Sequence, residues 1–154
     1  MDLLKELKEL LRQFEDQQID YALCGGLAMA VYAFPRATLD IDILIEPQSL
    51  ESVRSIANQL GYTIDVGSME FNAGAIRIYR FTKIHEASAD AIPLDLLLVT
   101  PQIKEVWNDR CHVEWNEGQL SVVSPEGLIA LKSLRGSGQD QDDIKKLREI
   151  IDEG

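Results

Sequence analysis

The sequence predicts an α/β (α+β) fold, in which a mixed β-sheet is flanked by helices and followed by C-terminal helices. Segments with apolar residues at helical spacing alternate with short runs rich in aliphatic and β-branched residues. A glycine pair, Gly25-Gly26, joins one such run directly to a helical segment. Because 154 residues is the length of one domain, we expect residues 1–154 to form a single domain with a helical part at 123–154.

The composition is ordinary for a soluble protein, with 45% hydrophobic and 27% charged residues. No apolar run approaches the ~20 residues of a membrane-spanning helix, and the charged, amphipathic start from Asp2 is unlike a signal peptide. We therefore expect a cytoplasmic protein with no membrane partner, whose Cys24 and Cys111 are reduced. The net charge of −11 argues against a broad nucleic-acid-binding surface, although a short RNA end could still enter a locally basic cleft.

Apolar periodicity and capping residues predict the helices. Ser49, Thr100 and Ser124 are candidate N-caps, and Gly61 is a candidate C-cap. Pro35 disfavours helical backbone in the residue before it, so a helix should end there. The predicted helices span residues 3–16, 27–33, 49–60, 100–109, 124–135 and 144–151.

Runs of aliphatic and β-branched residues between Gly, Pro and Asn predict the strands. The predicted strands span residues 20–24, 39–45, 62–66, 75–82, 92–99, 112–115 and 119–123. The last two form a hairpin. Residues 67–74 are predicted to be an irregular connection, and residues 83–91 a hairpin loop.

The strand 39–45 carries two aspartates, Asp40 and Asp42. Side chains alternate along a strand, so both carboxylates point the same way, with Cα atoms about 6.5–7 Å apart. Like charges this close raise each other's pKa unless a positive group lies between them, and Mg²⁺ prefers such hard oxygen ligands. The alternative is a solvated polar face on a half-buried strand, which is common for a lone Asp-x-Asp.

Gly25 and Gly26 follow a hydrophobic strand end and open a helical segment. Glycine lets backbone approach a ligand closely, and the N–H groups at a helix start can bind an anion. For the glycine pair alone, a tight turn without a ligand is the better explanation. Its position ahead of the acidic strand favours a phosphate-binding turn.

Asp95 lies within the most apolar predicted strand, 92–99. A buried, unpaired carboxylate there would be costly, and a third carboxylate facing the first two would explain it. The alternative is an edge aspartate that faces water or caps a turn. Arg77 and Arg80 lie on opposite faces of strand 75–82, and the sequence leaves open which of them faces the aspartates.

The segment 25–42 contains a longer pattern, Gly25-Gly26-x-Ala28 … Arg36-x-Thr38-x-Asp40-Ile41-Asp42. This pattern resembles the signature of the DNA polymerase β-type nucleotidyltransferase superfamily. It is similar in particular to a small prokaryotic branch that includes the AbiEii-like toxins of toxin–antitoxin systems. In the superfamily a later strand supplies a third acidic residue, and Asp95 is the matching residue here.

A second stretch resembles the same branch: Ser124-Pro125-Glu126 … Lys132-x-x-Arg135 … Asp140-x-x-Asp143-Ile144. The resemblance implies Lys132 as a phosphate ligand and Asp143 or Asp140 as an orienting carboxylate. Taken alone, these residues are explained equally well by a surface lysine and a helix cap. The predicted nucleotide-binding residues are Gly25, Gly26, Arg36, Thr38, Lys132 and Asp143.

The resemblance implies an enzyme that moves a nucleoside monophosphate from an NTP to a hydroxyl acceptor. Asp40, Asp42 and Asp95 would be its catalytic and metal-binding residues, around two Mg²⁺ ions. A tRNA end, a protein and a small antibiotic are all compatible acceptors, and a cognate antitoxin or a second copy of the chain is a compatible partner. The alternative is a catalytically silent nucleotide-binding or toxin–antitoxin module on the same fold, against which the three carboxylates weigh.

Overall fold

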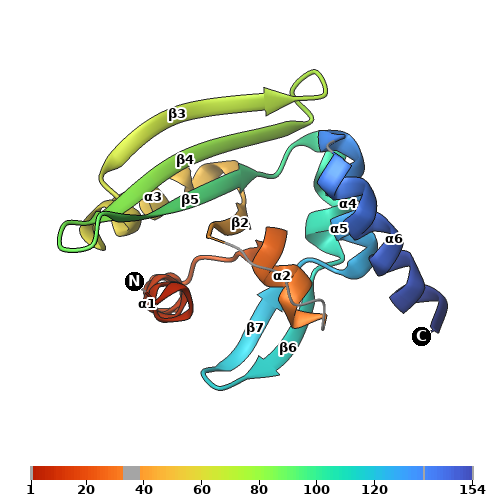
Figure 1. Ribbon diagram of the computed structural model, residues 1–154, viewed down its shortest axis with the longest axis horizontal. Helices are drawn as coiled ribbons and strands as arrows, with labels where there is room; N and C mark the ends of the chain where they lie inside the picture. Colours follow the sequence, from red (N-terminus) through yellow and green to blue (C-terminus); the bar gives the residue numbers. More distant parts are fainter. Residues whose placement is uncertain (1, 33–38, 137, 154) are drawn as a thin grey trace.

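The computed structural model describes residues 2–32, 39–136 and 138–153 (Figure 1). Within these residues seven strands form one sheet in the order β3-β4-β5-β2-β1-β7-β6. The strands are β1 (Ala22–Cys24), β2 (Ile41–Ile45), β3 (Ile64–Phe71), β4 (Ile76–His85), β5 (Asp90–Leu98), β6 (Cys111–Trp115) and β7 (Gly118–Val122). The pairs β2–β5 and β1–β7 are parallel, and the other pairs are antiparallel. The predicted mixed sheet and α+β class are confirmed.

Helices precede, connect and follow the strands. They are α1 (Leu3–Asp16), α2 (Gly25–Val31), α3 (Leu50–Gln59), α4 (Lys104–Asn108), α5 (Pro125–Arg135) and α6 (Gly138–Glu153), with 3₁₀ turns at Pro47–Ser49 and Pro101–Ile103. The Ser124 hydroxyl accepts a hydrogen bond from the Gly127 N–H at 3.0 Å, which confirms the predicted N-cap of α5. Ser49 precedes α3 without a side-chain cap, and Thr100 instead donates its hydroxyl to the Ala75 carbonyl at 2.6 Å.

The two faces of the sheet are covered by different helices. On one face, the Arg54 guanidinium of α3 lies 5.3 Å from the Phe81 ring, and Lys83 forms an ion pair with Glu6 of α1. On the other face, Leu97 of β5 shares a small cavity with residues of α5. The hydrophobic core therefore lies on both sides of β2 and β5.

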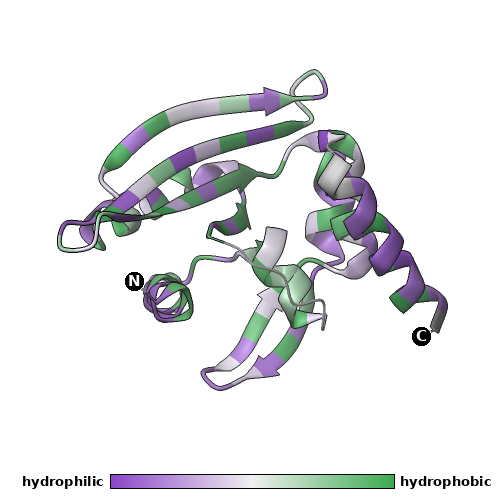
Figure 2. Ribbon diagram, in the orientation of Figure 1, coloured by the Kyte–Doolittle hydropathy of each residue, from purple (hydrophilic) through white to green (hydrophobic). Residues whose placement is uncertain are grey.

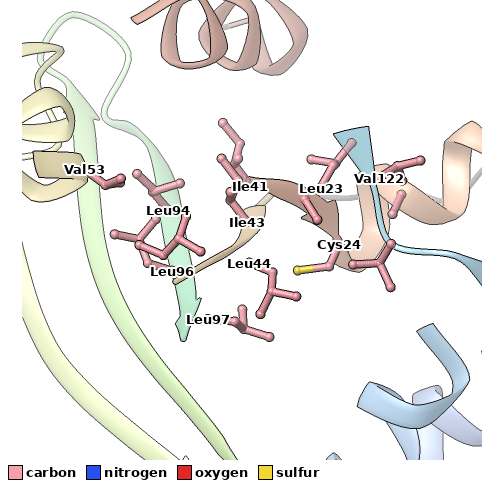
Figure 3. Packing of buried hydrophobic residues seen from close by; sticks show 14 of the residues in the cluster. Leu23, Cys24, Ile41, Ile43, Leu44, Val53, Leu94, Leu96, Leu97 and Val122 are labelled. Carbon is pink, nitrogen blue, oxygen red and sulfur yellow. The ribbon is translucent and has the colours of Figure 1, made fainter. Parts of the chain in front are cut away.

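Figure 3 shows the centre of this core, where β1, β2, β5 and β7 contribute side chains and Val53 of α3 points toward Leu94 and Leu96. Figure 2 shows hydrophobic residues concentrated on the central strands, whereas α6 is mostly hydrophilic. Only a narrow side of α6 is buried, and Leu147 is fully enclosed there. In the described part of the chain, no helix has the length and apolar character required to span a bilayer.

The prediction of an irregular segment at 67–74 is wrong, because β3 continues to Phe71. This strand lies at the edge of the sheet and pairs only with β4, so most of its side chains are exposed and lack an alternating apolar pattern. A bulge between Asp65 and Gly67, with Gly67 at φ 101°, further disturbs the periodicity.

The predicted hairpin loop at 83–91 is also too long. The β4–β5 ladder continues to the pair His85↔Asp90, so only four residues form the turn. The residues in these last pairs are exposed, so the sequence has no alternating apolar pattern there that would predict a strand.

Several other boundaries differ from the prediction. The final helix begins at Gly138 instead of 144, and α2 begins at Gly25 instead of Leu27. Strand β2 begins at Ile41, which leaves Asp40 immediately before the strand.

A buried polar cluster joins α1 to the sheet and to the end of α3. Glu6 accepts hydrogen bonds from the Tyr62 hydroxyl at 3.1 Å and from the Lys83 ammonium at 2.7 Å. Glu6 is only 9% exposed, so the two donors share an acceptor that water does not readily replace.

Replacing Glu6 with alanine is expected to lower the free energy of unfolding by about 2–3 kcal/mol, because a buried hydroxyl and a partly buried ammonium lose their acceptor. Urea unfolding followed by circular dichroism measures this change. Glu149→Ala, at an exposed position of α6, is the control and should change stability by less than about 0.5 kcal/mol. Equal losses in the two variants would contradict the prediction.

Candidate active site

The register of the sheet aligns four residues in a row across four strands. Arg80 of β4 lies opposite Asp95 of β5, Asp95 opposite Asp42 of β2, and Asp42 opposite Cys24 of β1. Directly paired residues project from the same face of a sheet. The row therefore brings a guanidinium, two carboxylates and a thiol together on the face covered by α5.

Asp95 is held by a bidentate ion pair with Arg80. The Arg80 Nε lies 2.7 Å from Asp95 Oδ1, and Nη2 lies 2.9 Å from Oδ2. The Asp95 side chain is 3% exposed and that of Arg80 is 31% exposed. The hydrogen bonds to Asp95 raise the pKa of Arg80, so the guanidinium stays charged. The buried Asp95 carboxylate thus has a charged partner within its apolar strand environment. The sequence left open whether Arg77 or Arg80 faces the aspartates. It is Arg80, whereas Arg77 pairs with Glu70.

Asp42 lies next to this pair and is partly buried. Burial raises the pKa of its carboxyl to about 7, with further contributions from the negative charges of Asp95 and Asp40. The positive charge of Arg135 on α5 opposes the shift. The ionised form of Asp42 is therefore disfavoured by its surroundings, and an added cation beside it would relieve the repulsion.

Gly25 leaves the space that the Asp42 side chain occupies. It has φ 66°, and a Cβ there would lie 2.6 Å from the Asp42 Cγ and 2.8 Å from its Cβ, overlapping the carboxylate. Glycine is thus required at this position both by the backbone conformation and by the closeness of Asp42. Gly26, the second glycine, is buried within the first turn of α2.

Lys132 of α5 and Asp143 of α6 form a buried ion pair, with Lys132 Nζ 3.0 Å from Asp143 Oδ2. Lys132 also lines a cavity of about 30 Å³ with Cys24, Gly25 and Asp42. This space is about that of one water molecule and far below that of a nucleotide. The lysine therefore lies beside Asp42, but it is bound to Asp143 and 7% exposed. Its role as a phosphate ligand stays a prediction.

Other predicted site residues are described only in part. Arg36 and Thr38 lie outside the described residues, as does the side chain of Asp140. Asp40 is partly exposed, and its charge acts on both Asp42 and Arg80. Among residues 2–32, 39–136 and 138–153, no three His, Cys, Asp or Glu side chains are arranged as a ready metal-binding group.

The structure adds three residues that the sequence analysis did not assign to the site: Arg80, Arg135 and Cys24. Strand alternation predicted that Arg77 and Arg80 lie on opposite faces of the sheet, but it could not tell which of the two faces the aspartates. Arg135 lies three residues after Lys132, a spacing that places both on one side of α5. Cys24 carried no signal beyond its position before the glycine pair.

A family model described as uncharacterised nucleotidyltransferase matches residues 1–152 of the chain. The chain belongs to this nucleotidyltransferase family. The resemblance to nucleotidyltransferases is thereby confirmed, and the protein is an enzyme of the nucleotidyltransferase class. No curated protein sequence matches the chain.

Solved structures of nucleotidyltransferases share the fold of this family member. The lincosamide antibiotic adenylyltransferase LnuA, bound to lincomycin, aligns over 95% of this chain and 96% of its own, with a TM-score of 0.57 and 18% identity. The nucleotidyltransferase candidate TM1012 from Thermotoga maritima aligns over 98% and 93%, with a TM-score of 0.59 and 15% identity. The antibiotic-resistance factor ANT(2'')-Ia aligns over 98% and 86%, with a TM-score of 0.60 and 14% identity.

Replacing Gly25 with alanine is expected to destabilise the protein more than the same change at Gly136. Both glycines have positive φ, 66° and 72°, but a Cβ at Gly136 meets no atom within 4 Å. Backbone strain should cost about 1 kcal/mol at either position. The overlap with Asp42 should add about 1–3 kcal/mol at Gly25 alone. Urea unfolding of the two variants measures the difference, and equal losses would refute the assigned contact.

Proposed function

We propose that this family member transfers a nucleoside monophosphate from an NTP to a hydroxyl acceptor in a Mg²⁺-dependent reaction. The observation that carries the proposal is the pairing of Asp42 with Asp95 across β2 and β5. Two carboxylates side by side, one with its pKa raised to about 7, form a site that gains from a divalent cation.

The donor chemistry fits Mg²⁺, because the candidate ligands are hard carboxylate oxygens on neighbouring backbone positions. Asp40, Asp42 and Asp95 would hold the metal, as a pair of ions. Bound there, Mg²⁺ would neutralise the triphosphate and stabilise charge on the attacking and leaving oxygens.

The chain's own residues would position the substrates. Asp42, fixed against Gly25, and Asp95, fixed by Arg80, are rigid groups on adjacent central strands. Gly25 and Gly26 would let backbone N–H groups approach the phosphates, and Lys132 would add a positive charge beside them. Arg36 and Thr38, and Asp143 as the partner of Lys132, complete the proposed nucleotide site.

In the reaction, the acceptor hydroxyl oxygen forms a bond to the α-phosphorus while the bond to the β-phosphate oxygen breaks. Pyrophosphate leaves, and the hydroxyl proton is lost to a base. Asp95 is proposed to serve either as a metal ligand or as that base. Most of the rate enhancement would come from alignment and charge neutralisation.

The acceptor is proposed to be a small molecule, an RNA end or a protein side chain, each presenting a hydroxyl. LnuA is named as a lincosamide antibiotic adenylyltransferase, and ANT(2'')-Ia was solved with adenylyl-2''-tobramycin. Both names favour a small-molecule acceptor here. The net charge of −11 also disfavours a long nucleic acid.

Closer kinship to the AbiEii-like branch, an antitoxin or homo-oligomeric partner and a cytoplasmic location remain predictions of the same hypothesis. A catalytically silent nucleotide-binding module is the alternative, and it predicts NTP binding without transfer of label.

Asp42→Asn is expected to lower label transfer from α-³²P-labelled NTP by at least about 10²-fold, because the central carboxylate of the site loses its charge. Asp65→Asn, an exposed aspartate of β3 whose Oδ1 accepts the Gly67 N–H, should leave the rate within about twofold. Scintillation counting of labelled product measures both. Wild-type turnover by Asp42→Asn would refute the proposal.

Incubating the protein with each labelled NTP and with total RNA, protein or small-molecule fractions of a lysate should label one fraction. The labelling should stop with EDTA and return with excess Mg²⁺. Labelling that persists in EDTA would contradict the metal dependence, and NTP binding with no labelled fraction would favour the silent module.

A further inference from the structure

Arg80 is in direct contact with one of the two paired aspartates, Asp95. Its guanidinium donates to both oxygens of Asp95, and its charge also interacts with those of Asp40 and Asp42. The Asp95 side chain is 3% exposed, so water can do little to solvate its negative charge. Arg80 therefore carries the counter-charge of the buried end of the site.

The neighbouring arginine on the same strand shows that this is not a general feature of β4. Arg77 pairs with Glu70 at 3.2 Å, and both side chains are about half exposed, at 44% and 57%. Such a surface pair contributes little to stability or to the site. Arg80 differs because its partner is buried and lies in the row with Asp42.

A guanidinium bound to both oxygens of Asp95 has two consequences. It fixes the rotamer of the carboxylate, because the fork of two hydrogen bonds permits one orientation. It also lowers the negative charge available to any divalent cation beside Asp42 and Asp95, because like charges repel. The first effect depends on the geometry of the guanidinium, and the second depends only on its charge.

We propose that Arg80 is a positioning residue that orients Asp95 and limits how tightly the site binds divalent metal in the absence of NTP. This inference rests on the proposed nucleotidyltransferase site. The negative charge of the triphosphate offsets the guanidinium, so metal binds fully only together with the nucleotide. Arg80 thereby couples metal binding to NTP binding without contacting either.

The experiment measures Mn²⁺ binding to the nucleotide-free protein by electron paramagnetic resonance. Two variants separate charge from geometry: Arg80→Gln removes the charge and keeps one amide donor, whereas Arg80→Lys keeps the charge and loses the fork. Arg77→Gln is the matched control on the same strand. Circular dichroism verifies that each variant is folded.

Arg80→Gln is expected to bind Mn²⁺ at least about fivefold more tightly than the unmodified protein, because a repelling charge is gone. Arg77→Gln should stay within about twofold of it, and Arg80→Lys should bind no more tightly than the unmodified protein, because the repelling charge remains. In the transfer assay, Arg80→Lys should lose at least about tenfold in kcat, with KM for NTP changed by less than about twofold, because Asp95 is misoriented while the charge remains.

Because circular dichroism verifies that the variants are folded, tighter binding by Arg80→Gln alone separates this role from a merely structural one. Unchanged or weaker Mn²⁺ binding by Arg80→Gln would overturn the proposal, as would equal tightening in Arg80→Lys. If the unmodified protein and Asp42→Asn bind Mn²⁺ equally weakly even with a non-hydrolysable NTP analogue present, the proposed metal site itself fails. If binding depends on Asp42 but not on the charge at position 80, only the role of Arg80 fails.

Discussion

The central constraint in this protein is the repulsion between two carboxylates on neighbouring strands, of which Asp95 is buried and Asp42 is partly buried. The register of β2 against β5 sets Asp42 opposite Asp95, in the middle of a sheet whose buried residues are mostly apolar. Two ionised carboxylates this close repel each other unless positive groups lie nearby or one of them takes up a proton. Arg80 supplies a positive group from β4, and Arg135 approaches from α5.

A second buried ion pair joins α6 to α5, the helix that lies beside Asp42. Lys132 is a buried cation beside the aspartates, and Asp143 of α6 is its buried partner. A buried ion pair adds little net stability, but each member needs the other. The pair therefore links the last helix to the candidate active site, and a helix that is mostly hydrophilic is held at one defined place (Figure 2).

The sequence predicted the parts of this arrangement that depend on local patterns. Alternation placed the acidic strand, and the isolated charge in an apolar run identified Asp95. Pairing across strands that are distant in sequence is not local, so the partnership of Arg80 with Asp95 emerged only from the fold. The length of β3 was missed because an exposed edge strand has no apolar face to reveal it. The second role of Gly25, making room for Asp42, likewise depends on contact between separate segments.

The central claim is that Asp42 and Asp95 share a divalent cation with a bound NTP. The most direct measurement is anomalous diffraction from crystals grown with Mn²⁺ and a non-hydrolysable NTP analogue. We predict a manganese peak about 2.1–2.3 Å from carboxylate oxygens of both Asp42 and Asp95. Clear density for the analogue with its manganese bound away from these two aspartates would contradict the account.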